Sequence, residues 1–424
     1  MEKRFLFIIL AFALVLICFI GCEPDYPPSI YDPNDEGGPT PVITSINPPD
    51  STYGLIAPTK IVEITGQHFS DVIEYNLVYF GSELGTVLDA AESQLTVEPP
   101  ANFQDSLTIK VASRGAYLFG YYGTEDNPHP YKLKNAISKP GGYLAEDNAG
   151  GICVDANENL YVARTKSSTL IEIDKVTPSG VREKFGELRK QTNNIKIGPE
   201  GAFYYVYTKF FFKTTIDSAG NATHKNKRLS GNLYGLDFDS NKNLYAVGAD
   251  AIYTIDPSTL SNSKLGEYED TTFTVARIYN DELYTVGSYV GYDTTVSTST
   301  FLWKIPLDIT TGTFAGDMEI VLDWSTTAYP LATITSLAFN QNGKMYISTK
   351  SNSLLSIEPV AGSYSTGIVE QVYPRLLGSE SVFRMIWGEG DYLYINSQND
   401  ADPDKNSILK VNMFELSAPY NGRN

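Results

Sequence analysis

Three stretches of the chain repeat one nine-residue pattern: VDANENLYV at 154–162, FDSNKNLYA at 238–246 and FNQNGKMYI at 339–347. Each begins with an apolar residue, passes through a polar turn, and continues into an apolar stretch whose second residue is tyrosine. Short apolar stretches separated by turn residues are typical of β-strands. Because the pattern returns along the chain, it predicts a repeat architecture of antiparallel strands.

Six segments share the wider pattern of a strand, a polar turn, a strand with a tyrosine near its start, and a further strand. They are 151–174, 196–217, 235–256, 275–308, 336–358 and 384–412, with marker tyrosines Tyr161, Tyr205, Tyr245, Tyr284, Tyr346 and Tyr394. A four-stranded blade takes about 40 to 50 residues, so the spacing predicts a six-bladed β-propeller over 138–416. The pattern resembles NHL-type propellers. We expect a strand from the segment 138–147 to close the ring, because closure hides sheet edges.

A small antiparallel sandwich is expected at 41–134, where short strands alternate with turn residues. Its segments resemble IPT/TIG immunoglobulin-like domains, in the order PVITSINP (41–48), VEITGQHF (62–69), VYFG (78–81), VEPPA (97–101) and LTIKV (107–111). The family has a Gly-Gly pair where this chain has Ala57-Pro58-Thr59. The resemblance implies a spacer or binding module without common catalytic residues. We interpret His68 as a loop residue and expect Tyr79 inside the domain. The expected fold class is therefore all-β, an Ig-like sandwich followed by a six-bladed propeller.

The chain begins with a short basic segment, an apolar run over 5–20, and Gly21-Cys22. These features describe an export signal. The placing of Cys22 resembles the lipobox of bacterial lipoproteins, which implies removal of 1–21 and acylation of Cys22, so that lipid ties the protein to a membrane. The alternative is an ordinary membrane anchor that keeps 1–21. The acidic, proline-rich segment 22–40 is expected to be an extended linker. It resembles the surface-export signal of Bacteroidota lipoproteins, which implies an outer-membrane lipoprotein exposed at the cell surface.

Composition narrows the class of partner. The chain carries 32 Lys and Arg against 50 Asp and Glu, a formal net charge of −18. A strongly acidic surface disfavours nucleic acid as a partner. Beyond Cys18 in the signal and the lipidated Cys22, only Cys153 remains, so no intrachain disulfide is expected. We interpret Cys153, within an apolar run, as a packed strand residue rather than a nucleophile.

Asp and Asn recur in the polar turns with calcium-loop spacing, but their recurrence favours turn capping over a single metal site. The segment Asp400-Ala401-Asp402-Pro403-Asp404-Lys405 occurs once, and Asp400, Asp402 and Asp404 match the first three calcium-loop positions. Lys405 replaces the usual glycine, and Val411 replaces the bidentate glutamate. We therefore expect no cofactor, with calcium at these three aspartates as the open alternative.

Catalytic motifs are scarce. The chain has three histidines, His68, His129 and His224, none near another in sequence, and it contains no serine-hydrolase, zinc-protease or phosphate-loop motif. The long interval after Tyr284 places loops 287–300 and 325–335 on one face of the propeller. The expected ligand-binding residues on that face are Tyr289, Tyr292, Trp324, Tyr329, Arg164 and Lys166. Exposed aromatic rings suit sugars or a peptide. The alternative is that these aromatic residues pack between blades.

Three hypotheses follow. The first is a surface-tethered, non-catalytic lipoprotein whose propeller binds an extracellular glycan or protein, with the Ig-like domain as spacer. The second is a propeller enzyme of the lactonase, lyase or glycosidase type, because folding can bring carboxylates together that the sequence keeps apart. The third is a structural or assembly component of the envelope. A carboxylate cluster, a ligand groove or a broad apolar patch would distinguish them.

Overall fold

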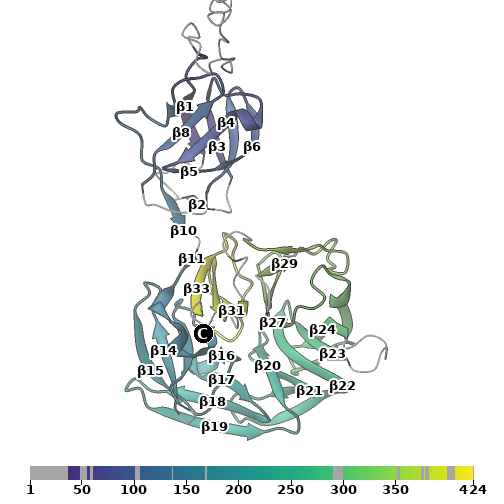
Figure 1. Ribbon diagram of the computed structural model, residues 1–424. Coiled ribbons are helices and arrows are strands. Elements are labelled where there is room, and N and C mark those ends of the chain that lie inside the picture. Colours follow the sequence, from purple (N-terminus) through teal and green to yellow (C-terminus); the bar gives the residue numbers. More distant parts are fainter. Residues whose placement is uncertain are drawn as a thin grey trace, which may run out of the picture. The chain divides into compact units, whose positions relative to one another are not determined.

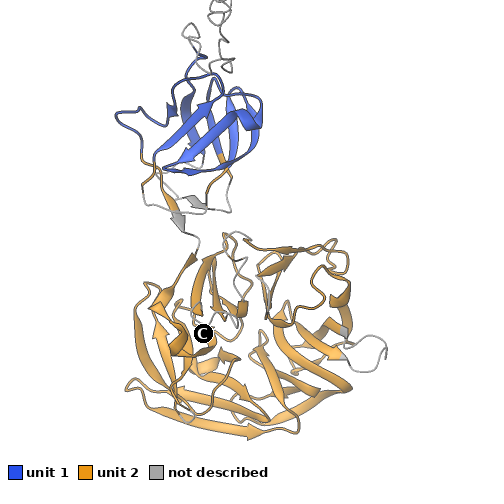
Figure 2. Cartoon of the chain, in the orientation of Figure 1, with its two compact units in different colours: residues 1–47, 63–97, 108–129 blue, residues 48–62, 98–107, 130–424 orange. Residues whose placement is uncertain are grey.

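The computed structural model describes residues 37–47, 55–57, 61–100, 106–135, 137–167, 170–289, 299–350, 354–373, 377, 382–398 and 406–423. Cys22, Tyr292 and the three aspartates Asp400, Asp402 and Asp404 lie outside these residues. The chain divides into two compact units (Figure 2): residues 1–47, 63–97 and 108–129, and residues 48–62, 98–107 and 130–424.

The first unit contains two four-stranded sheets that face each other as a sandwich (Figure 1). One sheet has the order β1 (Val42–Asn47), β3 (Val62–Gln67), β7 (Gln94–Glu98), β6 (Thr86–Ala91). The other has the order β5 (Glu83–Leu84), β4 (Asn76–Phe80), β8 (Ile109–Ser113), β9 (Gly120–Tyr121). Two short strands, β2 (Leu55–Ala57) and β10 (Leu133–Asn135), pair in parallel and belong to the second unit.

The predicted alternation of buried and exposed residues holds in β3 and β4. Every second residue of β3 and β4 is buried, as a two-residue period requires when one sheet face is covered. Val78 and Phe80 are therefore in the core, whereas Tyr79 between them points to the outer face and is half-buried. There its ring packs edge-on against the ring of Phe119, with 5.8 Å between the two ring centres. Tyr79 therefore lies within the first unit, as expected, on the outer face of β4.

The second unit is a six-bladed β-propeller (Figure 1). Blade one consists of β12 (Ala149–Val154), β13 (Leu160–Thr165), β14 (Ile171–Val176) and β15 (Arg182–Leu188). Blade two consists of β16 (Ile195–Ile197), β17 (Phe203–Tyr207), β18 (Phe210–Ile216) and β19 (Ala222–Arg228). Blade five consists of β27 (Ile334–Phe339), β28 (Met345–Thr349), β29 (Leu355–Ile357) and β30 (Val369–Gln371). The first strand of each blade is its inner strand.

Blades three and four form one continuous hydrogen-bonded sheet. Its strands are β20 (Leu233–Phe238), β21 (Leu244–Ile255), β22 (Asn262–Tyr279), β23 (Glu282–Tyr289), β24 (Ser299–Asp308), β25 (Thr313–Phe314) and β26 (Glu319–Asp323). The two longest strands each serve two positions, and each contains a residue with left-handed backbone, Asp250 (φ 60°) and Asp270 (φ 60°). The second half of β22 is thus the inner strand of blade four.

The ring closes as predicted. Blade six contains β31 (Val382–Trp387), β32 (Tyr392–Ser397) and β33 (Ser407–Asn412), and its outer strand is β11 (Ile137–Ser138) from the segment between the two domains. Ile137 pairs with Val411, and Ser138 pairs with Lys410. The strand lies slightly before the expected segment, because residues 140–142 and 145–147 form 3₁₀ turns instead.

The repeated polar turn is an architectural element, as the sequence indicated. In blade one, Asp155 Oδ1 accepts hydrogen bonds from the backbone N–H groups of Asn157 (2.9 Å) and Asn159 (2.8 Å). The marker tyrosine Tyr161 donates its hydroxyl hydrogen to Asp155 Oδ2 at 3.1 Å. Asp239 makes the equivalent contacts in blade three. Both carboxylates are thus used in capping a turn and in accepting a buried tyrosine hydroxyl.

Candidate functional site

The C-terminal tail, residues 413–423, closes one end of the channel at the centre of the propeller. Its partners are carbonyl groups at the last residues of the inner strands, namely Val154, Ile197, Phe238, Phe339 and Trp387. The label C in Figure 1 marks the C-terminal end of the chain, which lies inside the ring of blades. Residues 417–423 lie beyond the predicted end of the propeller at 416, yet they pack against its centre. We call this end of the channel, where the inner strands finish, the tail end.

Arg423 is the central residue of the tail end and is 5% exposed. Its Nε donates to the carbonyl of Val154 at 3.0 Å, its Nη2 donates to the carbonyl of Trp387, and its Nη1 pairs with Glu389 at 3.0 Å. Tyr420 packs beside it, with the Arg423 Cζ atom 4.9 Å from the ring centre. Every side of this guanidinium therefore has a protein partner, so the tail end is a structural seal.

The opposite end, where the inner strands begin, contains a small void of about 30 Å³. We call it the loop end. Residues from β12, β16, β22, β27 and β31 line the void, which places it on the axis of the ring. Its polar lining consists of Asn193, Asn194, Lys196, Thr335, Ser336 and Arg384.

The cations of the channel outnumber its buried acids. Lys196 Nζ lies 3.4 Å from Asp237 Oδ1, and Arg277 Nη1 lies 3.1 Å from Asp237 Oδ2. Burial lowers the pKa of Lys196, and the carboxylate of Asp237 opposes that shift. Arg384 forms no ion pair within the described part of the chain, and its buried Nε has no hydrogen-bond partner. Burial alone lowers the pKa of Arg384. Among the described residues, the positive charge of Arg384 at the loop end thus has no carboxylate partner.

An amide-lined pocket of about 250 Å³ adjoins the void between blades six, one and two. Its six side-chain amides are Asn148, Gln191, Asn193, Asn396, Gln398 and Asn406. Asn193 lines both the pocket and the void, so the two hollows are continuous in their lining. Within the described residues, the exposed side chains of Gln191 and Asn193 make no hydrogen bond, which leaves donors and acceptors for a ligand. Leu144, 58% exposed, supplies an apolar wall.

The aromatic residues predicted to bind ligand do not form an exposed cluster. Trp324 is fully buried (0% exposed) in the core of blades four and five, and its Nε1 donates to the carbonyl of Ala332 at 2.8 Å. Tyr329 is half-buried and packs against the same core. Tyr289 ends β23, but its side chain is not described. The expectation of an exposed Trp324 is wrong because the long interval before it extends blade four, through β24, β25 and β26, rather than forming loops alone.

Arg164, predicted to lie on the ligand rim, is instead buried in an ion-pair cluster. It contacts Asp147 at 3.2 Å, Glu172 at 3.0 Å and Asp174 at 2.9 Å. Arg182 pairs with Asp147 at 2.6 Å, and its hydrogen bonds are the main cause that lowers the pKa of Asp147 to about 2. The prediction of Arg164 as a ligand contact is therefore wrong, because three carboxylates occupy its guanidinium. Lys166 is exposed, as expected for a rim residue.

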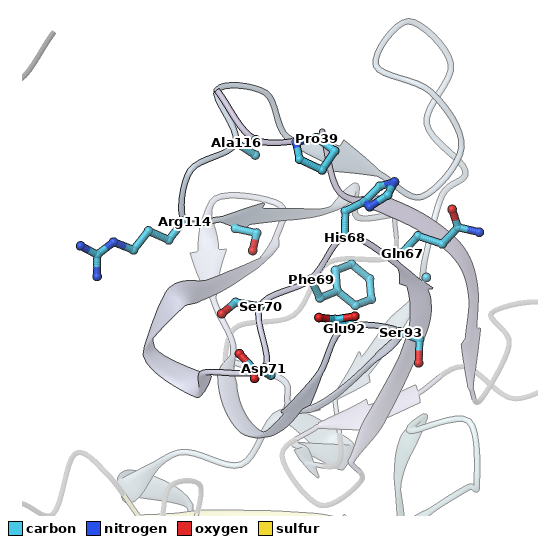
Figure 3. A pocket seen from close by; sticks show the side chains of 13 residues that line it. Pro39, Gln67, His68, Phe69, Ser70, Asp71, Glu92, Ser93, Arg114 and Ala116 are labelled. Atoms are coloured by element: carbon cyan, nitrogen blue, oxygen red, sulfur yellow. The ribbon is translucent and has the colours of Figure 1, made fainter. Parts of the chain in front are cut away.

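The first unit contains a larger, open pocket of about 640 Å³ (Figure 3). His68, Asp71 and Glu92 line it and are exposed, and His68 adopts left-handed backbone (φ 62°), which agrees with its interpretation as a loop residue. The Arg114 side chain points away from the pocket in Figure 3 and stacks on Tyr75, with Cζ 4.3 Å from the ring centre. These groups do not converge, so the loop end of the propeller is the stronger candidate site.

Among the described residues, no group of three or more His, Cys, Asp or Glu side chains is arranged to hold a metal ion. The three candidate calcium ligands are outside those residues, so calcium there stays an untested alternative. Cys153 is buried, as expected, and burial raises the pKa of its thiol. No helix in the described ranges is sufficiently long and apolar to span a membrane.

The IPT/TIG domain family matches residues 41–127. Those residues are an IPT/TIG domain. A candidate phosphatase from Bacteroides thetaiotaomicron is 10% identical over 88% of this chain and 97% of its own, with a TM-score of 0.51. An auxiliary nutrient binding protein from the same organism is 12% identical over 90% of this chain and 98% of its own, with a TM-score of 0.47. At such identities the similarity concerns the fold alone. No curated protein matches this chain.

Proposed function

We propose that this protein is a non-catalytic lipoprotein of the outer membrane, and that the loop end of its propeller binds an extracellular glycan. The observation that carries the proposal is the amide-lined pocket beside the channel. The amides of Asn148, Asn396 and Gln398 already donate to backbone carbonyls. The exposed amides of Gln191 and Asn193 can both donate and accept, which matches the alternating donors and acceptors of sugar hydroxyls. The IPT/TIG domain and the acidic linker would hold the propeller away from the membrane.

Binding can be tested with the full chain, purified in detergent and applied to an array of bacterial, plant and host glycans. We expect at least one glycan class to bind, and replacing Gln191 or Asn193 with Ala to weaken that binding. Gln371→Ala is the matched control, because Gln371 is an exposed amide on the outer strand of blade five. Equal loss in the control, or breakdown of any bound glycan by the purified chain, would contradict the proposal.

Attachment through Cys22 is tested separately. Cells that express the chain are labelled with palmitate, and the labelled protein is compared with a Cys22→Ala variant. We expect the label on the unaltered chain only, and protease added to intact cells to remove the propeller. Label on the variant would contradict lipidation at Cys22. A mature protein that still carries residues 1–21 would show that the segment is an ordinary anchor.

A further inference from the structure

Arg384, which is half-buried, differs from the buried arginines of the propeller because, among the described residues, no acid pairs with it. Arg164, Arg277 and Arg423 each lie within 3.2 Å of a carboxylate oxygen. Arg384 Nε is buried without a hydrogen-bond partner, and the nearest aromatic contact is the ring of Phe383, whose centre is 5.2 Å from Cζ. Burying part of a guanidinium without a partner is unfavourable. A ligand that supplies a negative charge would offset this cost.

The surroundings of Arg384 add to the positive charge rather than cancel it. Lys196 lines the same void. The acid that pairs with Lys196 is Asp237, which also pairs with Arg277. The chain as a whole has a formal charge of −18, so this positive centre runs against its overall balance. Low-dielectric walls strengthen such a field.

The size of the void limits what can enter. A cavity needs about 10–15 Å³ to hold one water molecule, so a void of about 30 Å³ admits only a small group. A small anionic group such as a carboxylate fits, while the rest of the ligand has to lie outside. Directly outside, Asn193 leads into the amide-lined pocket. That lining of amides favours sugar hydroxyls over the apolar side chains of a peptide.

We propose that the loop end binds an acidic glycan, with the carboxylate of one uronate residue entering the void beside Arg384 and the sugar ring lying against the amides. This inference rests on the proposed function and names its ligand class. Arg384 would be the charge partner of the carboxylate, and Asn193 would contact both parts of the ligand. Charge-assisted hydrogen bonds of this kind are about twice as strong as neutral ones.

The test is calorimetric titration of the full chain in detergent with tetrasaccharides of galacturonate, mannuronate and glucuronate-N-acetylglucosamine, each compared with its methyl ester. The ester keeps the size and hydroxyls of the ligand and removes only its charge. We expect at least one acid to bind about tenfold or more tightly than its ester. Arg384→Met should remove that difference, and Arg384→Lys should retain part of it. Arg228→Met, at an exposed position on β19, is the control.

Each outcome decides between the two proposals. Equal binding of acid and ester, or an acid preference that survives in Arg384→Met, would overturn the inference and leave glycan binding standing. Binding of none of the saccharides here, together with none on the array, would overturn both. N-acetylglutamate that binds as tightly as the tetrasaccharides would assign the void to a peptide carboxylate and overturn the glycan assignment. The comparison of acid and ester needs no variant, so it holds even if Arg384→Met folds poorly.

Discussion

The two ends of the propeller channel differ in how their arginine side chains are paired. At the tail end, Arg423 donates to two backbone carbonyls and pairs with Glu389, so each of its faces is used. At the loop end, Arg384 has no acid partner among the described residues, and its Nε has no acceptor. Arg384 lies on the inner strand β31, whereas Arg423 belongs to the C-terminal tail. Their difference separates a residue that holds the fold together from one that is held ready for a ligand.

The distinction has an energetic basis. A buried polar group without a partner costs about 1–3 kcal/mol, and more when it is charged. A fold retains such a group only where the remaining structure compensates for it. Removing a paired arginine should therefore destabilise the propeller, whereas removing the unpaired one should not. The three tryptophans, Trp303, Trp324 and Trp387, all belong to the propeller, so their fluorescence follows its unfolding without interference from the IPT/TIG domain.

The largest effect is expected at Trp324, which tests whether blade four belongs to the ligand face at all. Trp324→Ala removes a fully buried ring and leaves the carbonyl of Ala332 without its donor. We expect the free energy of unfolding to fall by about 3–5 kcal/mol, measured by urea unfolding with the fluorescence of the other two tryptophans. Glycan affinity per folded molecule should stay unchanged. A stable variant with weaker binding would return Trp324 to the ligand site.

A smaller loss is expected at the tail end. Arg423→Ala leaves the carbonyls of Val154 and Trp387 unpaired in the channel, so the propeller should lose about 2–4 kcal/mol in urea unfolding. Arg228→Ala, on the exposed outer strand β19, should change the midpoint little and serves as control. If Arg423→Ala behaves like Arg228→Ala, the tail end is not a structural seal.

The ion-pair cluster of Asp147, Arg164 and Arg182 on blade one predicts that the free energy of unfolding depends on pH. Hydrogen bonds from Arg182 lower the pKa of Asp147 to about 2, whereas an unfolded aspartate titrates near about 3.9. Between these two pKa values the folded state binds fewer protons than the unfolded state. The contribution of the Asp147 carboxylate to the free energy of unfolding is therefore complete above about pH 4 and is lost as the pH falls toward 2. We expect the stability gap between the unaltered chain and Asp147→Asn to narrow as the pH falls from about 5 to about 2. A constant gap would contradict the assigned pairing.

The smallest effect on stability is expected at the loop end. Arg384→Met replaces an unpaired cation by an apolar chain of similar length, so the propeller should be unchanged or more stable by up to about 1 kcal/mol. Thermal unfolding measured by tryptophan fluorescence shows whether the variant is more or less stable than the unaltered chain. A loss as large as that of Arg423→Ala would mean that Arg384 has a structural partner.

The fold was predictable because its signals are local and repeated. The turn residues Asp155 and Asp239 and the tyrosines that follow them lie within one nine-residue pattern, so each copy carries its own evidence. Ring closure followed from the early end of blade six, which left a free edge that β11 covers. The long interval after Tyr284 was harder, because added residues lengthen strands as readily as loops.

The candidate site was less predictable because charge pairing is not local. Arg164 meets carboxylates 8, 10 and 17 residues away, on its neighbouring strand and on the turn before blade one. Arg384 shows no special pattern in sequence, and its importance comes from the absence of an acid on five inner strands spread from Ile152 to Ile386. The run of Asn and Gln around 191–194 and 396–398 was a readable signal for the amide-lined pocket. It gained meaning only when β12, β16 and β32 came together.

Hydrogen–deuterium exchange of the full chain, with and without a saturating acidic tetrasaccharide, tests the contrast between the two ends most directly. We expect slower exchange at the loop end, in peptides that cover 191–196 and 382–387, with no change in 417–423 or 324–332. The methyl ester should protect 191–196 less and 382–387 not at all. Protection of the tail in place of the loop end, or no protection anywhere in the propeller, would contradict the assignment of the loop end as the ligand site.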